Sequence, residues 1–155
     1  MRIGYGFDSH PFGPQRLLKL GGVTVPSQAG LAGHSDSDVV LHAVADALFG
    51  AMGEPDIGEQ FPPAEPKWRD ADSALFVRAA CERMRRMKLK VGNLDMTVIA
   101  DEPKLSPHKA GIRSQLAELL GVGAAQVSVK AKTTEGMAGG KPGIAVHAVV
   151  LLIPE

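Results

Sequence analysis

Apolar residues recur along the chain with two spacings, one typical of strands and one typical of helices. Runs of alternating or continuous apolar residues predict strands, because side chains on a strand alternate between its two faces. A shorter apolar segment, residues 16–26, predicts a hairpin that turns at Gly21 and Gly22. The strands predicted outside this hairpin are residues 1–7, 94–100, 126–133 and 144–153.

Apolar residues spaced three and four apart predict helices in three other parts of the chain. Ser35 is expected to cap the first helix, with Asp38 three residues later as in a capping box. Gly121 is expected to end the last one, because glycine readily adopts the left-handed conformation found there. The three predicted helices lie within residues 34–53, 71–89 and 106–121.

The order of these elements predicts an α/β (α+β) fold. A strand, a hairpin, two helices, a strand, a helix and two strands suit one small domain over residues 1–155. We expect a mixed four-stranded sheet with the helices packed on one face, plus the short hairpin. Residues 54–70 are rich in Pro, Gly and charge, and are expected to form a long loop of the kind that often carries function.

The composition and charge argue against two classes of partner, nucleic acids and membranes. The chain has 155 residues with 17 Lys+Arg and 17 Asp+Glu, so its formal net charge is zero. Proteins that bind nucleic acid through bulk charge usually carry a basic excess, so we expect no nucleic-acid partner. The sequence has no apolar run of membrane-spanning length and no signal-peptide pattern. We therefore expect a cytoplasmic protein with no membrane partner.

Two metal-ligating residue types stand two positions apart near the end of the first predicted strand. Asp8 and His10 share one side of an extended chain, and His42 on the first helix is a candidate third ligand. Three such ligands suit Zn²⁺ with one position open to substrate, and Asp46 could hold the other imidazole nitrogen. In the alternative interpretation, His42 only bonds Asp38 or Asp46 on its own helix, and Asp8 and His10 begin a loop.

Three other segments have the residue types that bind phosphate. His34 and Ser35 precede the first helix, whose free N–H groups favour anions, although plain capping explains Ser35 as well. Lys104 follows a strand in a proline-containing loop, where it is either a phosphate ligand or a solvated side chain. Residues 132–135 combine an ammonium, two hydroxyls and a carboxylate, which suits a phosphate with Mg²⁺, or equally a polar strand end.

Taken together, five motifs resemble those of one enzyme family. The segments GYGFDSH, GHSDSDVVLHAVADALFGAMG, DIGEQFP, PKLSPH and KAKTTE stand in the order and spacing of the 2-C-methyl-D-erythritol 2,4-cyclodiphosphate synthases. The resemblance runs from Met1 to the last predicted strand. It implies a homotrimer with active sites between neighbouring subunits. It also implies conversion of 4-diphosphocytidyl-2-C-methyl-D-erythritol 2-phosphate into the cyclic diphosphate, with release of CMP, by attack of the 2-phosphate on the β-phosphorus.

The resemblance also assigns roles to residues. It implies that Asp8, His10 and His42 bind Zn²⁺ and that Glu135 helps to hold Mg²⁺ or Mn²⁺. It places His34 and Thr133 at positions that stabilise the transition state. The substrate-binding positions that it implies are Asp8, Ser9, His10, His34, Ser35, Asp56, Ile57, Gly58, Phe61, Glu65, Ala100, Pro103, Lys104, Leu105, Ser106, Lys132, Thr133, Thr134 and Glu135.

The sequence departs from the family pattern at two places. Pro63 stands where the family usually has an aspartate that contacts the methylerythritol, and only Glu65 is a nearby acid, so we expect weaker substrate binding or a reshaped loop. The turn at residues 135–144 is shorter than in many members and offers only Lys141 as a cation, so we expect poor binding of an isoprenoid diphosphate. A metal-dependent phosphohydrolase and a non-catalytic trimeric binding module remain alternatives.

Overall fold

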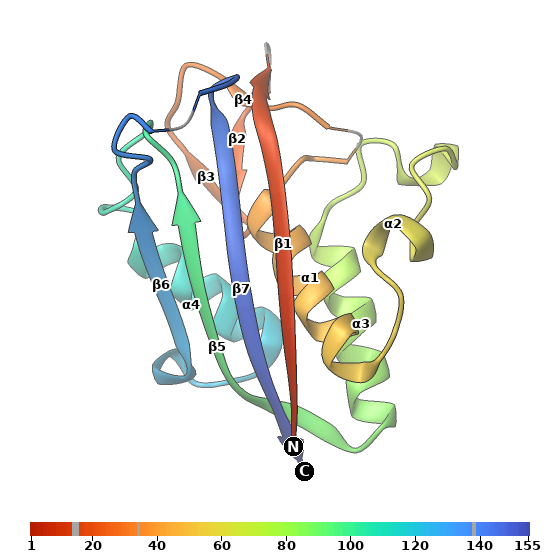
Figure 1. Cartoon of the computed structure of the whole chain (residues 1–155). Coiled ribbons are helices and arrows are strands. Elements are labelled where there is room, and N and C mark those ends of the chain that lie inside the picture. The colour runs from red at the N-terminus through yellow and green to blue at the C-terminus, as the bar shows by residue number, and fades with distance from the viewer. Residues whose placement is uncertain (14–15, 34, 138) are drawn as a thin grey trace.

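The computed structural model describes residues 1–13, 16–33, 35–137 and 139–155. Figure 1 shows helices behind one face of a twisted sheet, with the two termini side by side at one end. In chain order the elements are β1 (Arg2–Gly13), β2 (Leu18–Leu20), β3 (Val23–Val25), β4 (Gly30–Leu31), α1 (Val39–Met52), α2 (Ile57–Gln60), the 3₁₀ turn η1 (Pro66–Trp68), α3 (Ala74–Arg86), β5 (Leu89–Ile99), α4 (Lys109–Leu120), the 3₁₀ turn η2 (Ala124–Gln126), β6 (Val127–Lys132) and β7 (Gly143–Pro154).

The sheet is mixed, with the strand order β4-β1-β7-β5-β6. β7 is antiparallel to both β1 and β5, and β6 is parallel to β5. The predicted mixed sheet with helices on one face is confirmed, as is the β2–β3 hairpin that turns at Gly21 and Gly22. The sheet has five strands where four were predicted. The additional strand, β4, was not predicted because it is only two residues long and pairs with β1 only at Phe12 and Gly13. The predicted loop at residues 54–70 contains α2 and η1.

β1, β5 and β6 all point the same way, because both β1 and β5 run against β7. The carboxyl ends of these three strands therefore lie at the same end of the sheet, which is the top in Figure 1. Asp8 and His10 lie in the second half of β1, and the loops after β5 and β6 leave from the same edge. The fold thus brings the candidate residues toward one end of the molecule.

Helix α1 packs unusually close to β1 because the strand carries glycines on its inner face. A Cβ atom at Gly4 would lie 1.8 Å from the carbonyl oxygen of Ala47, and one at Gly6 would lie 2.0 Å from that of Ala43. The alanines on α1 match this need, since larger side chains would hold the two elements apart. This close approach sets the position of His42, which lies one residue before Ala43.

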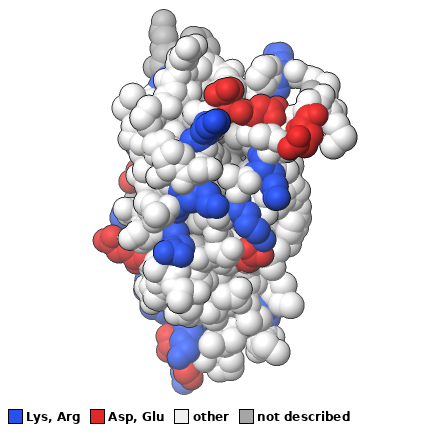
Figure 2. All heavy atoms as spheres, turned by 90° about the vertical axis from the view of Figure 1, so that its left-hand side faces the viewer, with Lys and Arg blue, Asp and Glu red and all other residues white. Residues whose placement is uncertain are grey.

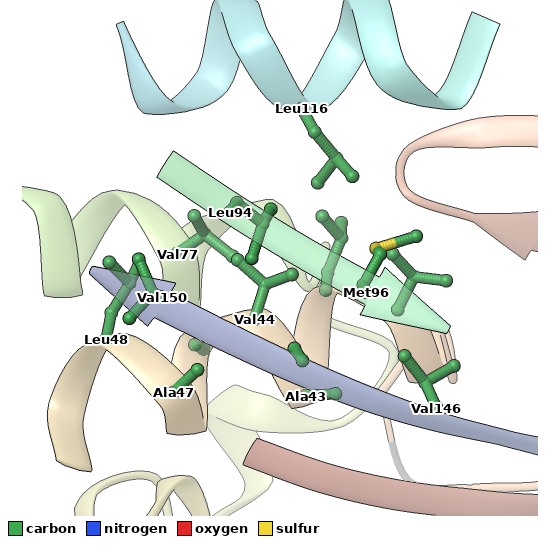
Figure 3. Close-up of a cluster of buried hydrophobic side chains, with 14 of the residues drawn as sticks. Ala43, Val44, Ala47, Leu48, Val77, Leu94, Met96, Leu116, Val146 and Val150 are labelled. Carbon is green, nitrogen blue, oxygen red and sulfur yellow. The ribbon is translucent and has the colours of Figure 1, made fainter. Parts of the chain in front are cut away.

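The hydrophobic core lies between the sheet and the helices. Figure 3 shows α1 side chains such as Val44 and Leu48 meeting Val150 of β7, Leu94 of β5 and Val77 of α3. Along α1 only Asp46 and Gly50 escape burial. Burial of this kind contributes about 25 cal/mol for each Å² of apolar surface, so α1 is held mainly by packing.

The start of α1 differs from the prediction. Its N-cap is Asp38, whose Oδ1 accepts hydrogen bonds from the N–H groups of Val40 and Leu41 at 3.1 Å each, so Ser35 does not cap the helix. Asp38 is fully buried, and its carboxylate also accepts the N–H groups of Gly21 and Gly22 at 2.8 and 2.7 Å. The carboxylate therefore fastens the hairpin to the helix and does not face the metal candidates.

The opposite face of the sheet carries no helix (Figure 1). Ile3, Tyr5 and Phe7 on β1 and Val149 on β7 expose 72, 58, 46 and 42% of their surface there. Tyr5 Oη lies 2.9 Å from Nδ1 of His147 on β7. Among the described residues, no helix is long and apolar enough to cross a bilayer.

Candidate active site

Asp8, His10 and His42 converge at the predicted position. Oδ2 of Asp8 lies 2.9 Å from Nε2 of His10 and 2.9 Å from Nδ1 of His42, and these two nitrogens are 3.3 Å apart. One carboxylate oxygen and two imidazole nitrogens, all within 4.8 Å of one another, form a group that could hold a metal ion. Two histidines and a carboxylate are a common donor set of catalytic zinc sites, and they leave a position open.

The local electrostatics favour a charged carboxylate in this group. Burial opposes ionisation of Asp8, but hydrogen bonds from His10 and His42 and their positive potential outweigh it and hold the pKa of Asp8 well below its ordinary value. The hydrogen bond to Asp8 raises the pKa of His10, against the effect of burial. Asp8 is thus negatively charged at neutral pH, as a candidate metal ligand must be.

The non-ligand nitrogen of each histidine has a partner. His10 Nδ1 donates to the carbonyl oxygen of Ala32 at 2.7 Å, so Nε2 is the nitrogen that faces Asp8 and His42. His42 Nε2 lies 3.0 Å from Oγ of Ser35 and 2.9 Å from Oγ of Ser73. Both imidazoles are therefore oriented by contacts outside the group of three.

The expected contact between Asp46 and His42 is wrong. Oδ1 of Asp46 accepts the N–H of Ile57 at 2.8 Å, so this carboxylate fixes the start of α2 and does not meet the imidazole. Burial raises the pKa of Asp46, and the hydrogen bond from Ile57 only partly offsets it. The residue that does hold His42, Ser73, was not found from the sequence, since it lies just before α3 and reaches His42 only through packing of the two helices.

A cavity of about 220 Å³ opens beside the three candidate ligands. Ile57 and Gly58 of α2 line it, and Asp56 caps α2 by accepting the N–H of Glu59 at 2.9 Å. The remaining wall is mostly apolar and is formed by Phe61, Pro63, Trp68 and Phe76. We call the three candidate ligands together with this cavity the metal half of the site.

The other predicted residues lie in the loops after β5 and β6, residues 100–106 and 132–135, which we call the loop half. Asp101 ties these loops together, because its two oxygens accept the N–H and the hydroxyl of Thr134 at 2.8 and 2.7 Å. The hydroxyl of Thr133 donates to Oε1 of Glu135 at 2.6 Å. The two hydrogen bonds from Thr134 hold the pKa of Asp101 below its ordinary value. Asp101 is a second residue that sequence reasoning missed.

Within one chain the two halves remain apart. β1 and β6 are three strand spacings apart in the sheet, which is about 14 Å at the usual spacing. The described residues that line the metal cavity include none from the loop half. A separate hollow joins Ser9 and His10 of β1 to Asp101 and Thr134. Within the described part of one chain, the loop half therefore does not open into the cavity beside His42.

Several predicted residues have contacts that bear on their roles. His34 lies outside the described residues. The carboxylate of Glu65 pairs with Nζ of Lys67 at 2.6 Å, and Pro63, not Glu65, lines the cavity. Lys104 is exposed, whereas Ala100 and Leu105 are buried in the core.

The side of the molecule that carries β6 and α4 is rich in cations. Figure 2 shows Lys and Arg side chains gathered over this side, with several acidic side chains above them. Lys109 and Arg113 line a hollow between α4 and β6, and Lys130 pairs with Asp95 at 2.6 Å. Although the formal net charge of the chain is zero, the charge beside the loop half is locally positive and suits an anionic ligand.

Comparisons with known proteins give a consistent result. The sequence model of the YgbB family matches residues 1–153. The 2-C-methyl-D-erythritol 2,4-cyclodiphosphate synthase of Halalkalibacterium halodurans is 50% identical over 155 residues, covering 99% of each chain. The synthase of the same name from Moorella thermoacetica is 50% identical over 155 residues, covering 99% of this chain and 95% of that one.

The solved structures extend this similarity to the fold. A 2C-methyl-D-erythritol-2,4-cyclodiphosphate synthase in a CDP-bound form matches with a TM-score of 0.91 at 38% identity, over 98% of this chain and 100% of that one. Sequence and fold thus agree over nearly the full length compared. The chain belongs to the YgbB family, the family of the 2-C-methyl-D-erythritol 2,4-cyclodiphosphate synthases.

Proposed function

We propose that this chain converts 4-diphosphocytidyl-2-C-methyl-D-erythritol 2-phosphate into 2-C-methyl-D-erythritol 2,4-cyclodiphosphate and CMP, a step of isoprenoid precursor synthesis. Family membership supports the reaction, and the observation that carries it to this chain is the convergence of Asp8, His10 and His42 beside a cavity. The reaction is an intramolecular displacement. An oxygen of the 2-phosphate bonds to the β-phosphorus, and the bond from that phosphorus to the CMP oxygen breaks.

The protein's main task in this reaction is orientation. The attacking 2-phosphate is ionised at neutral pH, so no strong protein base is needed. The substrate must instead be folded so that this oxygen lies in line with the β-phosphorus, which can supply several kcal/mol. We assign Ile57 and Gly58 to the ribose, residues 100–106 to cytosine and phosphate, and the apolar wall at Phe61 to the methylerythritol.

Cationic and hydrogen-bonding groups would stabilise the charge that develops on the phosphates. Lys104 and Lys132 are exposed ammonium groups in the loop half, and the hydroxyl of Thr133 is exposed beside them. Donors placed where charge develops typically contribute a factor of about 10²–10³ each. We assign His34 and Thr133 to the non-bridging oxygens, and Ser9, Ser35 and Thr134 to further phosphate contacts.

We assign Zn²⁺ to Asp8, His10 and His42, and Mg²⁺ or Mn²⁺ to Glu135 together with substrate phosphates. The donor set supports the first assignment, because the lone pairs of one carboxylate and two imidazoles meet and both other nitrogens are satisfied elsewhere. A carboxylate oxygen suits the harder second ion. When bound, such ions act as Lewis acids that lower the negative charge on the phosphates.

We further propose a homotrimer in which the metal half of one subunit meets the loop half of its neighbour. Two observations support this arrangement. The halves lie three strands apart in one chain, and the sheet face that carries Ile3, Tyr5 and Phe7 is apolar and uncovered. Contiguous exposed apolar surface of this kind is typical of subunit interfaces. Each closed trimer would then contain three sites, one at each interface.

The test of this function is ³¹P NMR of the purified chain with substrate, Zn²⁺ and Mg²⁺. We expect two mutually coupled resonances of the cyclic diphosphate to appear together with CMP. CMP with only acyclic phosphates would overturn the proposal in favour of a metal-dependent phosphohydrolase. A lack of any turnover would overturn it in favour of a non-catalytic binding module.

A further inference from the structure

The two histidines of the metal half are oriented by different kinds of partner. His10 Nδ1 faces the carbonyl oxygen of Ala32, which can only accept, so its proton position follows directly. His42 Nε2 faces two hydroxyls, on Ser35 and Ser73. A hydroxyl can donate or accept, so these contacts alone do not say which nitrogen of His42 carries the proton.

A carboxylate decides the direction of these hydrogen bonds. Oγ of Ser73 lies 2.5 Å from Oδ1 of Asp36, and a charged carboxylate can only accept, so the Ser73 proton points to Asp36. Asp36 is held in place by the N–H groups of Asp38 and Ser73 at 3.3 Å each and by Lys19 at 3.4 Å. Because the Ser73 hydroxyl donates its hydrogen bond to Asp36, it can only accept a hydrogen bond from His42.

The remaining hydroxyl fits the same scheme. Oγ of Ser35 accepts the N–H of Ser37 at 3.2 Å and lies 3.3 Å from Oγ of Ser73, to which it can donate. Ser73 Oγ then donates once and accepts twice, which is its full capacity. In the form that binds a metal through Nδ1, His42 carries its proton on Nε2, and Ser73, which can only accept, is a hydrogen-bond partner for that proton at 2.9 Å.

The hydroxyl of Ser73 has no competing structural task. Serine just before a helix usually uses its hydroxyl to cap the helix, yet Ser73 makes no such bond at the start of α3. The carboxylate of Asp72 accepts the N–H of Ala74 at 2.9 Å instead. Ser73 is completely buried, and among the residues that the structure describes its hydroxyl contacts only Asp36, His42 and Ser35.

We propose that Ser73, with Asp36 behind it, is a positioning residue that fixes the metal-binding tautomer and the ring orientation of His42. The inference rests on the metal site proposed above. It predicts that the hydroxyl at position 73 controls metal affinity without touching metal or substrate. Groups that hold a ligating histidine in this way typically change metal affinity about 10–100-fold.

The test is the affinity of the purified chain for Zn²⁺, measured by competition with a chromophoric chelator. We expect Ser73→Ala to bind Zn²⁺ about 10–100-fold more weakly than the natural chain. Ser73→Thr keeps the hydroxyl and should restore most of the affinity, and Asp36→Asn should weaken binding because the neutral amide no longer fixes the direction. Ser114→Ala, on the exposed face of α4, is the matched control and should bind as the natural chain does.

A spectroscopic readout separates positioning from general damage to the fold. In the Zn²⁺-loaded natural chain, ¹H–¹⁵N NMR should show a protected Nε2–H of His42, because this proton is buried and hydrogen-bonded to Ser73. In Ser73→Ala the signal should shift and exchange faster with water, while Ser114→Ala leaves it unchanged. Equal affinity and an unchanged Nε2–H in Ser73→Ala would overturn this inference alone. Failure of the natural chain to bind Zn²⁺ would overturn the metal site as well.

Discussion

The metal half and the loop half are built in opposite ways. In the metal half, Asp8 and His10 stand in the second half of a strand and His42 in the first turn of a helix, and partners from other elements fix each ring. In the loop half, Lys104, Thr133 and Glu135 stand on connecting segments and are exposed. One chain is therefore enough to shape the metal half, but it leaves the loop half facing solvent.

This difference fits the proposed trimer, in which one subunit provides the metal half of a site and its neighbour provides the loop half. A buried site needs exact placement, which strands and helices provide, whereas loops can adapt to a nucleotide once a neighbour covers them. The Asp101–Thr134 bonds hold the two loops to each other but not to the metal half. We therefore expect large effects from changes in the metal half and smaller effects from loop and surface changes.

The largest effect is expected from removing a metal ligand. His42→Ala leaves Asp8 and His10 as a two-ligand site, so Zn²⁺ should dissociate and turnover should fall by about 10³-fold or more, since metal assistance is worth several kcal/mol. CMP release gives the rate, and metal analysis gives the occupancy. His108→Ala, before α4, is the control. Full Zn²⁺ occupancy in His42→Ala would contradict the ligand assignment.

A glycine-to-alanine pair compares the tight contact of β1 with α1 and an open turn before β7. Gly6→Ala places a methyl group 2.0 Å from the carbonyl oxygen of Ala43, so β1 and α1 must move apart. We expect roughly 3 kcal/mol lower stability against urea, the size of a strong overpacking penalty. Gly139→Ala, where the structure shows nothing within 4 Å, should change stability little. Equal stability of the two variants would contradict the close contact of α1 with β1.

Pro63→Asp tests the departure from the family pattern in the cavity wall. Pro63 offers no acceptor to the substrate, while an aspartate can accept a hydrogen bond from a methylerythritol hydroxyl. We expect KM to fall by about 10-fold, the value of one good hydrogen bond to a charged group, with little change in kcat. Pro63→Ala, which restores the backbone N–H without a carboxylate, is the control. The idea fails if both variants bind substrate as the natural chain does.

The smallest effects concern two aspartates whose pKa values move in opposite directions. Burial raises the pKa of Asp46, so the folded chain binds this proton more tightly than the unfolded chain does, and ionisation above about pH 4 lowers stability. Asp46→Asn should therefore be slightly more stable than the natural chain at pH 7, with the difference vanishing below about pH 4.

Asp95 provides the opposite case on β5. Its hydrogen bond with Lys130 lowers its pKa, so ionised Asp95 stabilises the fold above about pH 4, and this contribution is lost as the pH falls. Asp95→Asn should be slightly less stable at pH 7, and only slightly, because an exposed pair is well screened. Urea unfolding at several pH values measures both variants. The same sign for both would contradict the assigned causes.

Local patterns were enough to predict most of the fold. The strands, the hairpin turn at Gly21-Gly22 and the end of α4 at Gly121 depend on short-range spacing and on backbone conformation, which the sequence displays directly. β4 was missed because two residues have no periodicity, and its pairing with Phe12 depends on the path of the chain. The start of α1 was misplaced because Oγ of Ser35 contacts Nε2 of His42 and does not cap the helix, a tertiary contact that local capping rules do not contain.

Residues of the candidate site could be predicted where they lie close together on one strand or helix, because their spacing is then visible in the sequence. Asp8 and His10 are two apart on a strand, His42 stood out as a histidine on the first predicted helix, and the family resemblance then implied the same three ligands. Ser73 and Asp36 could not be found, because their roles arise where α3 packs against α1. The contact expected for Asp46 was wrong for a related reason, since the chain folds back after α1 and brings the N–H of Ile57 to its carboxylate.

Subunit complementation tests most directly whether the two halves meet between neighbours. His42→Ala disables the metal half and Lys104→Ala the loop half, and each variant alone should be almost inactive. After unfolding and reassembly of an equal mixture, chance pairing in a closed trimer gives about a quarter of the sites two intact halves, so about a quarter of the natural rate of cyclic diphosphate formation should return. No activity above that of the separate variants, with mixed trimers verified by native mass spectrometry, would contradict a site shared between subunits.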